Sequence, residues 1–131
     1  MKQVAQRRFF TVDEARTLLP QLKEWVGEFV GLSRELEKFR PVVEKLAETA
    51  AQNTGAPEGT AYLEVLLCLQ KYLSKVQEAG CLVKSVQEGL VDFPHMREGR
   101  EVYLCWKYGE DDIEYWHEVD AGYTDRFPLV G

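Results

Sequence analysis

The sequence predicts an α+β protein in which a long helical hairpin packs on a small, mainly antiparallel sheet of three to four strands. Two changes along the chain support this prediction. Before residue 80, apolar residues recur at alternating spacings of four and three, as on a helix face, and after it they alternate every second residue, as in strands. A stretch rich in Gly, Pro and Asn, residues 51–59, divides the helical half in two. We expect residues 1–131 to form a single domain.

The first predicted helix spans residues 12–50. It begins at TVDE, where Thr11 can cap the helix and Glu14 can return the hydrogen bond. Pro20 and Pro41 both lie opposite the apolar seam, so they favour curvature of the helix, with a break before Pro41 as the alternative. The residues of the seam are Leu18, Leu22, Trp25, Phe29, Leu32, Leu36, Phe39, Val43, Leu46 and Ala50.

The second predicted helix spans residues 60–79 and ends at Gly80, a residue type that commonly follows the last helical turn. It would be about 30 Å long, against roughly 58 Å for residues 12–50. The short helix can therefore cover only the distal part of the long one. Either the C-terminal half of the chain or a second subunit must cover the proximal part.

Two glycines one helical turn apart, Gly27 and Gly31, predict that another element comes close to the proximal part of the long helix. A second copy of the chain would provide both this close approach and the missing cover. We therefore predict a homodimer formed through the proximal long helix. The residues of this predicted interface are Leu22, Trp25, Gly27, Phe29 and Gly31.

Residues 81–119 are predicted to form the sheet, and residues 120–131 an extended tail. The last two strands are predicted to form a hairpin closed by a four-residue turn at residues 109–112. A symmetric turn would place Leu104 opposite His117, so that His117 faces the apolar side of the sheet. The other pairs of this register are Tyr108 with Ile113, Trp106 with Tyr115 and Val102 with Val119.

Several motifs of the chain are familiar together. They are FFTVDEARTLLP near the start, then GLVDFP, GREVYLCWKYGE and YWHEVDAGYTDR. In this order they resemble a prokaryotic family known as domain-of-unknown-function family 2203, and the likeness covers nearly the whole chain. The resemblance implies no assigned activity and carries over no catalytic residue.

The stretch IEYWHEVDAG concentrates metal-competent side chains, with His117, Glu118 and Asp120 as candidates. Neighbouring strand residues point to opposite faces, so His117 and Glu118 cannot easily hold one ion. A lone histidine on an apolar face is more often a hydrogen-bonded core residue than a ligand. We therefore favour a structural role for His117 over a catalytic or metal-binding one.

Asp92 has two settings that the sequence leaves open. Burying Val91 and Phe93 is the more economical choice and turns Asp92 to the polar face, near Tyr103 and Glu118. Two close carboxylates there could share a proton or a cation, whereas the plainer interpretation is a solvated sheet face. In the opposite setting Asp92 could be the hydrogen-bond partner of His117.

The tail adds Arg126, whose guanidinium could bind a carboxylate or phosphate ligand. The commoner outcome is that such an arginine pairs with an aspartate and fastens the tail to the domain. Asp120 and Asp125 are the nearest candidates in the sequence for that pairing.

Composition restricts the classes of partner. The net charge of −6 argues against a phosphate-binding face and therefore against nucleic acid. The three cysteines, Cys68, Cys81 and Cys105, form no CxxC pair and are interpreted as small buried hydrophobes in a reducing compartment. No apolar run reaches signal-peptide or membrane-span length. We expect a soluble, cytoplasmic protein without a membrane partner.

No nucleophile elbow, P-loop, dinucleotide fingerprint, HExxH or paired-cysteine zinc motif is present in the sequence. We therefore predict a non-enzymatic, homodimeric interaction or binding module with no cofactor. The alternative is a small-ligand or divalent-metal-dependent activity at a site around His117, with His117 and Asp120 as the metal ligands. The candidate residues of that site are His117, Asp92, Glu118, Asp120, Arg126 and Tyr103.

Overall fold

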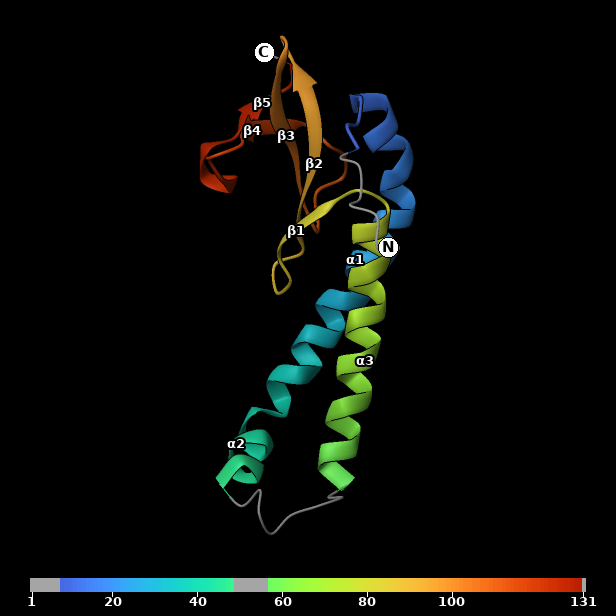
Figure 1. Ribbon diagram of the computed structural model, residues 1–131, viewed down its shortest axis with the longest axis vertical. Helices are drawn as coiled ribbons and strands as arrows, with labels where there is room; N and C mark the ends of the chain where they lie inside the picture. The colour runs from blue at the N-terminus through green and yellow to red at the C-terminus, as the bar shows by residue number, and fades with distance from the viewer. Residues whose placement is uncertain (1–7, 49–56, 131) are drawn as a thin grey trace, which may run out of the picture.

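A computed structural model of the chain describes residues 8–48 and 57–130 (Figure 1). The predicted α+β class is confirmed: the first and the last helix pack on one side of an open antiparallel sheet with the strand order β1-β2-β3-β4-β5. The strand count is higher than predicted because the tail adds a short edge strand. The elements are α1 (Val12–Lys38), α2 (Arg40–Glu48), α3 (Pro57–Glu78), β1 (Leu82–Ser85), β2 (Leu90–Arg97), β3 (Arg100–Lys107), β4 (Tyr115–Glu118), the 3-10 turn η1 (Tyr123–Asp125) and β5 (Phe127–Pro128).

The start of α1 is held by the reciprocal cap that the sequence predicts. The Glu14 amide donates to Thr11 Oγ1 at 3.0 Å, and the Thr11 amide donates to Glu14 Oε1 at 2.8 Å. Asp13 and Glu14 also place negative charge at the positive end of the helix. Local side-chain chemistry is therefore sufficient to define this helix start.

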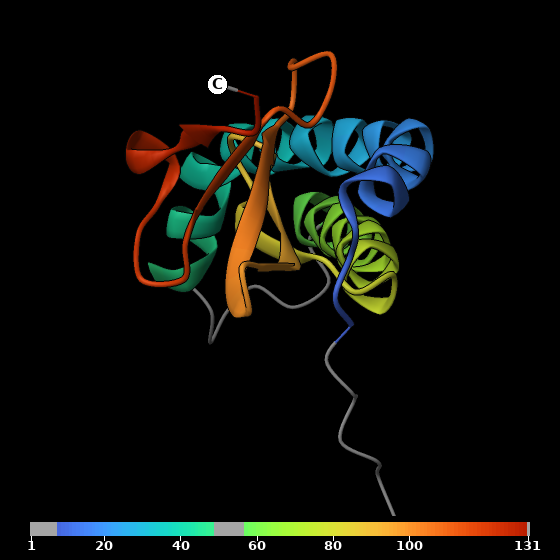
Figure 2. The same ribbon diagram turned by 90° about the horizontal axis from the view of Figure 1, so that it is seen from above.

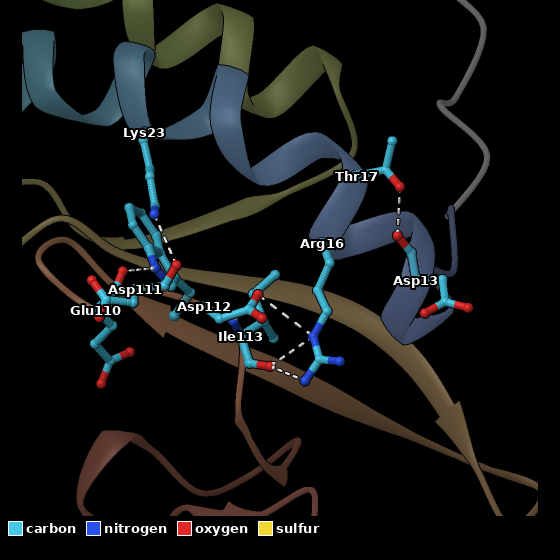
Figure 3. Close-up of polar contacts among 9 residues, drawn as sticks. Asp13, Arg16, Thr17, Lys23, Glu110, Asp111, Asp112 and Ile113 are labelled. Carbon is cyan, nitrogen blue, oxygen red and sulfur yellow. Dashed lines mark hydrogen bonds and ion pairs between the residues drawn. The ribbon is translucent and has the colours of Figure 1, made fainter.

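Replacing Thr11 with alanine is expected to lower the free energy of unfolding by about 0.5–2 kcal/mol, because the cap acceptor is lost. Thr17→Ala is the matched control. Thr17 Oγ1 donates to the carbonyl of Asp13 at 2.8 Å inside the same helix (Figure 3), and losing this bond should change stability by less than about 0.5 kcal/mol. Urea unfolding measures both variants. Equal losses would show that the cap contributes nothing of its own.

Pro20 lies inside α1 without breaking it, but the chain does break before Pro41. α1 ends at Lys38 and α2 begins at Arg40, which is the alternative that the sequence left open. Pro41 then stands in the first turn of α2, where a missing backbone N–H needs no partner. The last part of the predicted helix, residues 49–50, lies outside the described residues.

The chain's own sheet covers the proximal part of α1. Leu22 and Phe29 have no exposed surface and belong to one core with Phe93, Leu104 and Trp106 from the sheet. A side chain at Gly27 would lie 3.0 Å from the hydroxyl of Tyr108, which identifies the close approach, whereas Gly31 faces open space. Trp25 is half-buried and packs against the same core. The C-terminal half of the chain therefore provides the missing cover.

This cover removes the geometric reason for placing a homodimer interface on the proximal helix. Leu22 and Phe29 are already enclosed within one chain and cannot also be enclosed by a second copy. Homodimerisation itself stays a prediction. None of the described helices combines the length and the apolar character that a membrane crossing requires.

The hairpin of β3 and β4 differs from the predicted register by one residue. Tyr103 pairs with His117, Leu104 with Trp116 and Cys105 with Tyr115. The predicted symmetric turn and its pairs are therefore wrong. Because strand side chains alternate, this slip moves His117 from the helix-facing inner face to the opposite, outer face and puts Trp116 in the core.

The connection between these strands explains the slip. It runs from residue 108 to 114 and is shaped by Glu110, whose carboxylate accepts from the Lys107 amide at 2.8 Å and whose carbonyl accepts from the Trp106 indole at 2.9 Å. Two side chains of α1 hold the same loop: Lys23 donates to the carbonyl of Asp111 and Arg16 to that of Ile113 (Figure 3). The buried Ile113 thus belongs to the core and not to the strand.

Candidate functional site

Three neighbouring strands place polar side chains on the outer face of the sheet. Asp92 in β2 pairs with Cys105 in β3, and Tyr103 in β3 pairs with His117 in β4. Seen from above, α3 and η1 lie on opposite sides of β2 and β3, so this face is turned away from α3 (Figure 2). Asp92, Cys105 and His117 are nevertheless at most 2% exposed. They form a buried polar cluster outside the helix-facing core.

Both ring nitrogens of His117 are engaged. Nδ1 lies 2.7 Å from the carbonyl oxygen of Glu118, and Nε2 lies 3.0 Å from Asp92 Oδ2. A carbonyl oxygen only accepts hydrogen bonds, so Nδ1 carries a proton and donates it. The contact between Nε2 and Oδ2 then requires one further proton, shared by the imidazole and the carboxyl group. The Tyr103 ring packs edge-on against the imidazole at a centroid distance of 5.6 Å.

The second carboxyl oxygen of Asp92 is not satisfied. Oδ1 is buried and has no hydrogen-bond partner among the described residues. A buried acceptor without a partner costs about 1–3 kcal/mol, and native proteins rarely retain one without a reason. Burial raises the pKa of the Asp92 carboxyl above its ordinary value, while the neighbouring His117 and then Lys84 lower it. The Cys105 thiol also lowers the pKa of Asp92 through a hydrogen bond, so the two side chains are close enough to share a ligand.

Cys105 completes the cluster as a thiol. Burial raises the pKa of Cys105 to about 12, and the nearby Asp92 adds to this shift while Arg126 opposes it. The neutral thiol therefore prevails near pH 7, which argues against a free cysteine nucleophile in this state. A metal ion would change this, because coordination deprotonates a thiol.

The donor set of the cluster fits zinc. One ligand atom each from Asp92, Cys105 and His117 can be chosen so that all three lie within 4.8 Å of one another. Ligands about 2.0–2.3 Å from a tetrahedral zinc ion lie roughly 3.3–3.8 Å apart. Shifts of about 1 Å or less would therefore bring the three atoms onto one ion.

The end of the tail packs beside the cysteine side of this cluster. Arg126 Nη1 lies 3.1 Å and 2.9 Å from the two carboxylate oxygens of Glu110. Its guanidinium is also 4.0 Å from the ring centroids of Tyr115 and Tyr123. The sequence-based expectation that an aspartate pairs with Arg126 is thus wrong, because Glu110 occupies that position.

The structure does not bring all the predicted site residues together. His117, Asp92 and Tyr103 meet on the outer face, and Arg126 lies next to Cys105. Glu118 instead pairs with Arg100, and Asp120 is exposed and absent from the ligand cluster of the described residues. The predicted acidic row of Asp92 and Glu118 therefore does not form.

Cys105 is the residue that the sequence reasoning missed as a ligand. The prediction that Cys105 is buried is correct. Its position opposite Asp92 also places its thiol among other metal-competent side chains. The alternation of β2 and β3 already placed Cys105 and Asp92 on one face. The wrong register of β4 put His117 on the other face and concealed the triad.

Comparison with known protein families finds one model that matches residues 8–129, described as an uncharacterized conserved protein (DUF2203). The chain belongs to this family. The resemblance that the sequence motifs suggested is thereby confirmed. A comparison with curated proteins finds no match, and a comparison with solved structures finds none either. The matched region contains every residue of the Asp92, Cys105 and His117 triad, so the triad lies within the DUF2203 domain and not in an extension of it.

Proposed function

We propose that this DUF2203 protein binds a zinc ion through Asp92, Cys105 and His117. The observation that supports the proposal is the convergence of three different ligand types in a buried position, with Asp92 Oδ1 left without a partner. A carboxylate, a thiolate and an imidazole are all established zinc ligands. Mg²⁺ and Ca²⁺ prefer oxygen ligands only, so the sulfur and nitrogen atoms favour a transition metal.

Charge balance supports the same proposal. Two positive charges on the ion would balance the carboxylate of Asp92 and the thiolate of Cys105, with His117 neutral. The ion would take the place of the proton at His117 Nε2 and would give the unpaired Asp92 Oδ1 a partner, while the other polar contact of His117, through Nδ1, would stay with the Glu118 carbonyl. Such a backbone contact fixes the orientation of a metal-binding imidazole.

The role that best suits the buried position is structural. The three ligands come from β2, β3 and β4, so one ion would link three strands across the outer face. Binding to the folded state alone would add stability according to the zinc concentration. We therefore propose a zinc-stabilised, non-enzymatic binding module.

Zinc titration of the chelator-treated protein tests the proposal. Calorimetry is expected to find one zinc ion per chain, and cobalt(II) in its place should show a thiolate-to-metal charge-transfer band. Cys105→Ser and His117→Gln should each weaken zinc binding at least about 100-fold, because each removes a ligand from a site that has only three. Cys105→Ser should also abolish the charge-transfer band.

Two matched variants control for general damage. His95→Gln alters the only other histidine, and Cys81→Ser alters another buried cysteine. Both should bind zinc with the affinity of the wild type. Absence of zinc binding by the wild type, or equal losses in the control variants, would contradict the proposal.

A further inference from the structure

The segment between β4 and β5, residues 119–126, crosses beside the outer face of the sheet (Figures 1 and 2). We call this segment the strap. Its contact with β3 is made near Cys105: Lys107 Nζ lies 5.1 Å from the Tyr123 ring centroid, and the positive charge of Arg126 lowers the pKa of the Cys105 thiol. Tyr115, which the same guanidinium covers, is the strand partner of Cys105. The strap therefore encloses the cysteine side of the cluster.

The strap contributes little to the hydrophobic core. None of its residues is buried, and its backbone hydrogen bonds are local: the Ala121 amide donates to the carbonyl of Glu118 at the end of β4, and the Asp125 amide donates to that of Gly122. Segments with few buried apolar contacts open at a smaller free-energy cost than the core does. The contacts that resist opening are therefore the polar and aromatic ones at its end.

Arg126 makes most of these contacts. Its side chain is only 12% exposed, pairs with both oxygens of Glu110 and lies between the Tyr115 and Tyr123 rings. Glu110 belongs to the loop that sets the register of β4. Beyond Arg126 the chain is anchored again, since the ring centroids of Phe127 and Trp116 lie 4.9 Å apart and the Leu129 amide donates to the Glu114 carbonyl. Arg126 is thus the main fastening point of the strap between two anchored ends, beside the contact of Tyr123 with Lys107.

We propose that the strap is a lid over the metal site and that Arg126 is the positioning residue that keeps it closed. The inference rests on the proposed function in one respect, namely that the enclosed cluster receives zinc. Opening needs the loss of the Arg126 contacts with Glu110 and Tyr115 and of the Tyr123 contact with Lys107, whereas the contact between Arg126 and Tyr123 lies within the strap. Cys105 then becomes accessible, and zinc can enter or leave without unfolding of the helix-facing core.

The three cysteines provide a test that needs no metal. Cys68 is exposed, whereas Cys81 and Cys105 are buried in different places. In the metal-free wild type, a chromogenic disulfide reagent should therefore react quickly with one thiol and slowly with two. Arg126→Ala should raise the reaction rate of Cys105 on the order of tenfold to a hundredfold, because a charged hydrogen-bonded contact that resists opening is lost. Cys81 should stay slow.

Three further variants make the assignment specific. Adding Cys105→Ser to Arg126→Ala should leave a single fast thiol. Glu110→Gln, which keeps the arginine between its rings, should give a smaller increase at Cys105. Arg40→Ala is the matched control, because Arg40 also pairs with a carboxylate, that of Glu37, but does so at the junction of α1 and α2. This variant should leave the reaction of Cys105 slow.

Two results would overturn the lid. One is an unchanged Cys105 rate in Arg126→Ala, and the other is Cys81 becoming reactive in step with Cys105 in both Arg126→Ala and Glu110→Gln. Stopped-flow mixing with zinc alone then examines entry to the site. Faster association of zinc in Arg126→Ala supports the lid, and an unchanged association rate contradicts it. If zinc does not bind but Cys105 is selectively exposed in Arg126→Ala, the proposed function is refuted while the lid stands.

Discussion

Replacing His117 with alanine is expected to lower the free energy of unfolding of the metal-free protein by about 3–5 kcal/mol. The change leaves Asp92 buried without its imidazole partner, since Oδ2 pairs with His117 and Oδ1 has no partner that meets hydrogen-bond geometry among the described residues. It also removes a ring that is only 2% exposed and leaves a cavity. The decrease in the free energy of unfolding should therefore exceed the decrease caused by removing an ordinary buried hydrogen bond.

Urea unfolding of chelator-treated protein measures this effect. His95→Ala is the matched control, because His95 is half-buried and makes a hydrogen bond to the carbonyl of Phe10. This variant should lower the free energy of unfolding by about 1 kcal/mol. Adding Asp92→Asn to His117→Ala should recover part of the lost stability, since an unpaired amide is less costly to bury than an unpaired carboxylate. Simple additivity of the two changes would mean that the pair is not coupled.

Gly89→Ala is expected to destabilise the protein by about 2–5 kcal/mol, the sum of a left-handed backbone and an overpacked core. Gly89 has φ +68°, and an added Cβ would lie 2.6 Å from Tyr108 Cβ and 2.9 Å from Val26 Cγ1. Tyr108 cannot yield easily, since its amide donates to the Gly89 carbonyl at 3.0 Å. The strain therefore falls where the sheet meets α1.

The control for Gly89 is Gly99→Ala. Gly99 has φ +80°, but an added Cβ there would meet nothing within 4 Å. Thermal and urea unfolding should show a loss of about 1–2 kcal/mol for Gly99→Ala, due to the backbone alone. A similar loss at both glycines would mean that the packing around Gly89 relaxes freely.

Much of the fold could be predicted because it depends on neighbouring residues. The cap of Thr11 and Glu14, the stretch at residues 51–59 and the change from helical to strand periodicity are all local signals. Pro41 shows the limit of such signals. Its position opposite the seam favoured curvature, yet the chain breaks before it, and the separate helix α2 packs against both α1 and α3.

The candidate site could be predicted only in part. His117, Asp92, Tyr103 and Arg126 were all identified by residue type, yet the sequence placed His117 among apolar side chains and left Cys105 out of the site. Glu118 and Asp120 were included because they are adjacent in sequence, although Glu118 pairs with Arg100 and Asp120 faces solvent. Adjacency along a strand does not bring side chains together, because they alternate between faces.

The sequence by itself therefore determined the class of fold, the start of α1, the family and the types of side chain available for chemistry. The tertiary structure decided which of these side chains meet. The register of β4 depends on the loop before it, which Glu110 shapes from within and which Lys23 and Arg16 of α1 hold. A slip of one residue exchanges the two faces of a strand, so these distant contacts determine that His117 meets Asp92 and Cys105.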